Sequence, residues 1–196
     1  FRAGPILSRT FDVTTAQNQS TFSCWIKVCQ EGRENLIVHI RNGAYRIVNV
    51  VRNRWEFNPA GLNFQTYSDA LVRDFSAWYH AVVRQDNGTT TLFVNGQNFG
   101  TNTQCSPFFN NTGDNEITLG AVSLNHPESL DGYMADVYFI DGQALEPTAF
   151  GRYNANGVWV PREVDFTPAQ MRYSDYLTVS NGNQYGASSL AFNGDI

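Results

Sequence analysis

Cysteine is scarce in this chain of 196 residues, with only three, at positions 24, 29 and 105. A small odd set argues against a disulfide framework, and no Cys-x-x-Cys or Cys/His pair has the spacing of a zinc site. Cys24 and Cys29 are five residues apart, which in a strand places them on opposite faces, so they would not bond to each other. We therefore expect three reduced cysteines that serve as packing residues.

Charge and long apolar runs are also sparse. Charged residues make up 16% of the chain, and 13 Lys and Arg against 18 Asp and Glu give a formal net charge of −5. This acidic balance argues against a phosphate-binding surface, so nucleic acid is not an expected partner. No apolar run approaches the roughly 20 residues that a membrane helix needs, which predicts no membrane insertion.

Helical periodicity is nearly absent, and alternation at period two takes its place. Apolar and polar residues alternate in short runs separated by Gly, Asn and Asp, which is typical of antiparallel β-proteins. Three Asn-Gly dipeptides lie between or beside such runs and favour two-residue hairpin turns, at 42–43, 87–88 and 95–96. The only helix-like stretch is about one turn at 145–150, with Pro147 in its first turn and Gly151 as its stop. We expect strands at 21–28, 36–41, 45–52, 78–85, 89–94, 116–121 and 133–140.

The predicted fold is an all-β, two-sheet antiparallel jelly-roll sandwich. Hydrophobic residues make up 42% of the chain, and a single sheet of this content would leave an apolar face uncovered. In 133–140, alternation places Tyr133, Ala135, Val137 and Phe139 on one face, opposite Met134, Asp136, Tyr138 and Ile140. The predicted shared core contains Phe22, Cys24, Ile26, Leu92, Val94, Val137 and Phe139.

Alternation weakens beyond Trp159. We therefore expect the sandwich over residues 1–160, and an irregular extension or the start of a following module over 161–196. The chain begins with Phe1 rather than Met, and its last segment looks like a strand that enters a turn. These two features suggest either a piece of a longer polypeptide or disordered chain ends.

One series of short motifs resembles the laminin G-like, concanavalin A-like jelly-roll family. The series runs from Trp78-Tyr-His through Asp86-Asn-Gly, Leu92-Phe-Val and Asn95-Gly to Ile117-Thr-Leu-Gly, and ends with Gly132-Tyr-Met-Ala-Asp-Val. The match covers roughly residues 6–142. The resemblance implies a concanavalin A-like sandwich, a fold that hosts lectins, glycosidases and adhesion modules alike, so function has to be argued from a site.

A narrower resemblance lies at 131–151, in the string Ile140-Asp-Gly-Gln-Ala-Leu-Glu-Pro147, and in Gly157-Val-Trp-Val-Pro161. These segments are similar to laminin G-like modules in structural proteins of tailed bacterial viruses. The resemblance implies a non-catalytic virion module of a bacteriophage fibre, spike or capsid-surface appendage, which serves assembly and host-surface adhesion. Its implied partners are other copies of itself, other virion proteins and a host cell-surface glycan. The alternative hypothesis is a carbohydrate-binding lectin module of a secreted or surface protein. A glycan hydrolase is a third hypothesis.

Catalytic patterns are missing. Glycosidases of this sandwich type place carboxylates on one strand in a pattern like Glu-x-Asp-x-x-Glu, because acid and nucleophile must lie about 5 to 5.5 Å apart. No such triplet occurs, and no nucleophile elbow is present. Asp136 is the only acid inside the core of a predicted strand; it could be a ligand or metal carboxylate, or an acid on the outer or partly wet face. We therefore expect no enzymatic activity.

Ligand sites are weakly marked. Many relatives of the resembled family bind calcium through loop oxygens, and turn residues such as Asp86, Asp114 and Asp131 could supply them, but no Asp-x-Asp-x-Asp spacing occurs. We expect no metal and no cofactor, with calcium the one cation left open. Two interpretations of His80 are open: it could be a sugar-site residue, or a histidine packed between a sheet and a loop. The candidate carbohydrate-binding residues are aromatics and one amide in turn-rich segments: Trp55, Tyr67, Phe108, Phe109 and Asn110. For each of them, a position in the core or in an interface is the alternative interpretation.

Self-association is the last expectation. Phe108, Phe109, Tyr173, Tyr176 and Tyr185 lie in segments with no alternation to place them in the sandwich core. Aromatic residues are enriched in interface cores and are costly to leave exposed as one patch. Because viral appendages of the resembled kind are commonly threefold, we expect a homotrimer, with burial of the tyrosines inside one subunit as the alternative.

Overall fold

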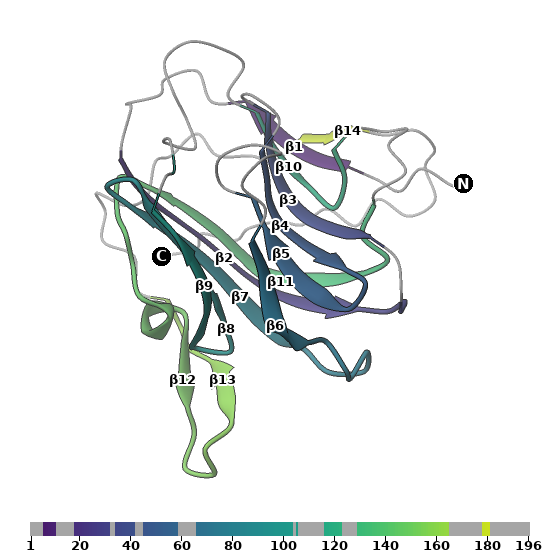
Figure 1. The fold of residues 1–196 in the computed structure, drawn as a ribbon, viewed down its shortest axis with the longest axis vertical. Helices are drawn as coiled ribbons and strands as arrows, with labels where there is room; N and C mark the ends of the chain where they lie inside the picture. Colours follow the sequence, from purple (N-terminus) through teal and green to yellow (C-terminus); the bar gives the residue numbers. More distant parts are fainter. Residues whose placement is uncertain are drawn as a thin grey trace.

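The computed structural model describes residues 6–10, 18–31, 34–41, 45–58, 66–103, 105, 116–122, 129–164 and 178–180. Within these residues, two antiparallel sheets pack face to face as a sandwich (Figure 1). The predicted all-β sandwich is confirmed. No helix of the described residues is long and apolar enough to cross a membrane.

The larger sheet has seven strands in the order β14-β1-β10-β3-β4-β5-β6. The alternating runs that the sequence marks become β3, β4 and β10, and the predicted pairing of the first two is confirmed. The strands not predicted are short or lack clear alternation. The bounds are β1 Ile6–Thr10, β3 Asn35–Arg41, β4 Tyr45–Val51, β5 Arg54–Phe57, β6 Thr66–Leu71, β10 Glu116–Leu119 and β14 Thr178–Ser180.

The smaller sheet has five strands in the order β11-β2-β7-β8-β9. Two Asn-Gly turns join its last three strands, and all four turn residues have positive φ, between 47° and 85°. Both predicted hairpins are therefore confirmed. The bounds are β2 Gln19–Val28, β7 Tyr79–Asp86, β8 Thr89–Val94, β9 Gln97–Asn102 and β11 Gly132–Asp141.

The shared core lies between the two sheets. Of the seven predicted core residues, Phe22, Cys24, Ile26, Leu92 and Val94 are at most 2% exposed, while Val137 and Phe139 are half-buried and pack against them. Burial raises the pKa of the Cys24 thiol well above its usual value, so this cysteine stays protonated, as the packing interpretation requires.

The face assignment of β11 needs a correction. The register with β2 shifts between Ala135 and Tyr138, and Asp136 in this bulge has φ 48°. One extra residue reverses the alternation, so Met134 packs against the core whereas Tyr133 and Ala135 are exposed. Simple alternation was wrong because it carries no information about a bulge. Asp136 itself is exposed.

The chain after β11 folds back over the outer face of the five-stranded sheet. A single 3-10 turn, η1 (Pro147–Ala149), confirms the predicted helical turn and leads into the hairpin of β12 (Gly151–Tyr153) and β13 (Trp159–Pro161) (Figure 1). Phe150 from this segment packs with Val82 and Ile140 of the sheet in a second apolar cluster. Farther along, β14 pairs with β1, so the predicted irregular extension contributes a strand to the sandwich.

Candidate functional site

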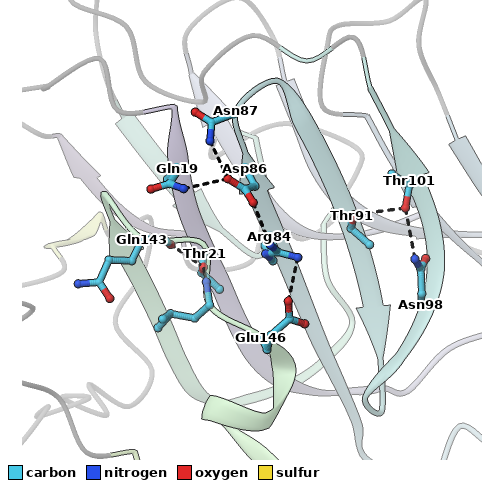
Figure 2. A network of polar contacts seen from close by, with 11 residues as sticks. Gln19, Thr21, Arg84, Asp86, Asn87, Thr91, Asn98, Thr101, Gln143 and Glu146 are labelled. Atoms are coloured by element: carbon cyan, nitrogen blue, oxygen red, sulfur yellow. Dashed lines mark hydrogen bonds and ion pairs between the residues drawn. The ribbon is translucent and has the colours of Figure 1, made fainter.

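Polar contacts hold the segment 141–147 on the outer sheet face. Thr21 donates its hydroxyl to the Gln143 carbonyl and accepts the Leu145 amide, both at 2.8 Å. Arg84 forms ion pairs with Glu146 and Asp86, each at 2.9 Å. Figure 2 shows the two ion pairs as dashed lines. The string at 140–147 thus has a packing role on this face.

Asp86 is the centre of that network. Its carboxylate accepts hydrogen bonds from Gln19 at 2.8 Å and from Asn87 at 2.9 Å, and it pairs with Arg84. The Gln19 hydrogen bond, and after it the Arg84 charge, lower the pKa of Asp86. One of the turn acids considered for calcium is therefore engaged by protein groups.

His80 lies on the same outer face, where two indole rings enclose it. Its ring stacks on Trp25 at a centroid distance of 5.0 Å and on Trp159 at 5.9 Å. The Trp159 indole N–H donates to Nδ1 at 3.0 Å, so Nδ1 is unprotonated and Nε2–H donates to the Ser23 hydroxyl at 2.9 Å. At 1% exposure, His80 is a packed residue, which confirms the core interpretation over the sugar-site one.

Trp159 anchors the β12–β13 hairpin on the sheet. A Cβ at Gly96 would lie 2.5 Å from its ring and one at Gly151 would lie 2.6 Å from it, so both backbones touch the indole. The Asn154 side chain accepts the amides of Asn156 and Val158 and shapes the hairpin turn.

A groove of about 290 Å³ opens beside this hairpin. We call it the hairpin groove; its described lining residues are Trp55, Leu71, Tyr79, Val94, Asn95, Gln97, Phe99, Tyr153, Gly157 and Trp159. Tyr153 is 51% exposed and Leu71 41% exposed, and Gln97 is exposed as well. Aromatic, aliphatic and amide side chains therefore meet on a surface that solvent can reach.

The Tyr153 ring is fixed in place. It meets Trp159 edge to face at 4.9 Å with an interplanar angle of 73°, and its hydroxyl donates to the Asn95 carbonyl at 3.2 Å. The Asn95 side chain in turn accepts the His80 amide at 2.8 Å. Because its ring and its hydroxyl are both held, the half-exposed Tyr153 side chain has little rotamer freedom left to lose in a binding event.

The predicted site residues divide into three groups. Trp55 reaches the groove wall, but it is 1% exposed and meets Tyr79 edge to face at 6.0 Å, which is a core position. The backbone of Tyr67 lies in β6. Phe108, Phe109 and Asn110 lie outside the described residues, as do Tyr173, Tyr176 and Tyr185 of the predicted trimer contacts, so these calls stay predictions.

Sequence reasoning missed Tyr153, Gln97 and Leu71. A hairpin of three-residue strands shows too little alternation to be recognised, although Asn154 and Gly157 do mark a turn between two aromatics. Within the described residues, no group of three or more His, Cys, Asp and Glu side chains could hold a metal ion.

Comparison with known families places the fold. The sequence profile described as the concanavalin A-like lectin/glucanases superfamily matches residues 6–149. The chain belongs to this superfamily. No curated protein matches the chain closely enough to add to this.

Three solved structures with the same fold are distant from this chain in sequence. A putative carbohydrate binding protein from Bacteroides ovatus has a TM-score of 0.55 at 16% identity, over 72% of this chain and 44% of that protein. The CBM40 of the Ruminococcus gnavus IT-sialidase, bound to α2,3 sialyllactose, has 0.51 at 18%, over 68% and 80%. Domain 4 of AbnA, a GH43 extracellular arabinanase from Geobacillus stearothermophilus in complex with arabinotriose, has 0.51 at 18%, over 68% and 65%. The chain thus spans less than half of the Bacteroides protein, and these likenesses establish the fold alone.

Proposed function

We propose that this chain is a non-catalytic carbohydrate-binding module and that the hairpin groove is its binding site. The observation that carries the proposal is the fixed, half-exposed Tyr153 ring beside the exposed amide of Gln97. An aromatic ring offers a flat apolar surface, and a few polar groups around it orient the ligand, which is how small-molecule sites commonly combine affinity with specificity.

The comparisons support this proposal in one respect. The descriptions of three proteins with this sandwich fold mention carbohydrate. One is described as a putative carbohydrate binding protein, and the other two are described with a bound oligosaccharide. The lack of a catalytic role is part of the proposal: it rests on the missing carboxylate triplet in the sequence, and within the hairpin groove no described lining residue is acidic.

A glycan array tests the function. We expect wild-type protein to bind a defined set of glycans and Tyr153→Ala to weaken that binding at least about fivefold, since aromatic hot spots contribute more than about 1 kcal/mol. Tyr133→Ala is the matched control, because Tyr133 is 63% exposed on β11 and is not a lining residue of the groove. Mass spectrometry of the bound glycans after long incubation should show no cleavage product.

Two outcomes would contradict the proposal. If no glycan on the array is bound, the carbohydrate-binding function is wrong. If Tyr153→Ala and Tyr133→Ala bind as wild type does, the function stands but the site lies elsewhere, with residues 108–110 as the next segment to mutate.

The virion placement, with its virion partners and threefold assembly, stays a prediction that the string at 140–147 motivates. The contacts of Thr21 and Arg84 with this string give it a packing role in this chain, which does not depend on a virion location. Detection of the chain by mass spectrometry in purified virus particles is the observation that would establish the placement.

A further inference from the structure

The described lining residues of the hairpin groove carry no charge. They include four aromatics with a polar edge, Trp55, Tyr79, Tyr153 and Trp159, and two amides, Asn95 and Gln97, but no Asp, Glu, Lys, Arg or His. Arg152 precedes Tyr153 in β12, and because neighbouring side chains of a strand point to opposite faces, it lies away from the groove.

An uncharged groove favours an uncharged ligand. A carboxylate or sulfate that leaves water for this surface would lose part of its hydration, and no described cation lines the groove to compensate. Hydroxyl groups lose less, and the amide of Gln97 can exchange hydrogen bonds with them. The C–H groups on one face of a pyranose or furanose ring form an apolar surface that can pack on the half-exposed aromatic ring of Tyr153.

We propose that the hairpin groove selects neutral saccharides over acidic ones, so that a terminal sialic or uronic acid is excluded. This inference rests on the proposed function and adds the class of ligand. It also separates this chain from the Ruminococcus module, whose description names a sialylated ligand.

Matched glycan pairs test the selectivity. Each pair has the same core with and without one acidic sugar, as in α2,3-sialyllactose and lactose, and the strongest neutral binder is then titrated calorimetrically. We expect the neutral member to bind at least about tenfold more tightly, and its affinity to stay constant between about 50 and 500 mM sodium chloride, because no ion pair is available to be screened.

A charge-adding variant makes the test specific to this groove. Gln97→Arg places a cation at the exposed rim and should reduce the preference for the neutral member at least about fivefold at low salt, whereas Tyr133→Arg, at the exposed position on β11, should leave it unchanged. Circular dichroism checks that both variants fold.

The outcomes separate the two proposals. Tighter binding of the acidic member, or affinity that falls as salt rises, overturns the selectivity while carbohydrate binding stands. An unchanged preference in Gln97→Arg also overturns it, because the groove would then not set the preference. Absence of binding to every member of every pair contradicts the carbohydrate function itself, and the selectivity with it.

Discussion

His80 is a buried residue whose charge state affects stability. Burial between Trp25 and Trp159 lowers the pKa of its imidazole to about 4, from about 6.5 in the unfolded chain. The Trp159 indole N–H also faces Nδ1, which leaves no acceptor for a second proton there. The folded state therefore holds neutral histidine, whereas the unfolded state takes up a proton first as the pH falls.

This difference predicts a loss of stability on mild acidification. The contribution of neutral His80 to the free energy of unfolding is fully present above about pH 6.5. It is lost as the pH decreases to about 4, by up to about 3 kcal/mol, at 1.4 kcal/mol for each pKa unit. Urea unfolding at a series of pH values measures it, with His80→Gln as the comparison because glutamine does not titrate. The difference in slope between the two proteins isolates His80; parallel curves over this range would contradict the assignment.

Asn49 presents a different problem at the same scale. It is 1% exposed in β4, yet its side-chain oxygen and nitrogen have no hydrogen-bond partner among the described residues. Such a group loses its contacts with water on folding and gains nothing in return. Asn35 is equally buried, but its amide accepts the Asp131 N–H at 3.0 Å and donates to the Gln30 carbonyl.

The two asparagines form a matched pair for mutation. Asn49→Leu should raise the free energy of unfolding by about 1 kcal/mol, and Asn35→Leu should lower it by about 1 to 3 kcal/mol, because it leaves the Asp131 amide unpaired. Chemical denaturation of both variants measures the difference. A destabilised Asn49→Leu would show that a partner, such as an ordered water molecule, satisfies this amide.

At the scale of elements, the contact between the β8–β9 turn and Trp159 decides whether the hairpin stays in place. Gly96 and Gly157 both have positive φ, +78° and +74°, so alanine costs about 1 kcal/mol of backbone strain at either. Only at Gly96 would the new Cβ overlap the indole ring; at Gly157 nothing lies within 4 Å. The pair therefore separates strain from packing.

We expect Gly96→Ala to cost more stability than Gly157→Ala, by about 1 to 3 kcal/mol, because the ring must shift or the hairpin must lift. Limited proteolysis between residues 154 and 158 should be faster in Gly96→Ala than in Gly157→Ala. Equal stability and equal cleavage in the two variants would mean that Trp159 does not hold the hairpin as described.

The elements that sequence predicts best are those with both alternation and a turn signal. The β7–β8–β9 hairpins have Asn-Gly turns, whose positive φ values follow from residue chemistry, and the core face of β2 follows from simple alternation. The bulge at Asp136 and the Arg52–Asn53 turn, which has positive φ without glycine, carry no such signal. Tertiary packing selects these conformations, so local sequence does not reveal them.

At the scale of the molecule, the fold was more predictable than the candidate site. The sandwich is encoded in many repeated local patterns, so one misplaced strand changes little. The hairpin groove instead depends on one contact between two segments far apart in the chain. Tyr153 and Trp159 of the β12–β13 hairpin pack on the β8–β9 turn. Trp55, a predicted site residue, lies in the core because of its place in β5. This strand is only four residues long, too short for alternation to reveal its buried face.

Calcium dependence is a property of the whole molecule, because a cation bound only by the native state raises the unfolding midpoint. We expect the midpoint to agree within about 1 °C between chelator and about 5 mM calcium chloride. The reasons are that the sequence lacks dense acidic spacing and that Gln19, Asn87 and Arg84 already engage Asp86. Differential scanning calorimetry makes the measurement, with magnesium as the control for general salt effects. A calcium-specific rise of several degrees would contradict the expectation. Asp86→Asn and Asp114→Asn would then show which turn supplies the ligands, by the variant in which the rise disappears.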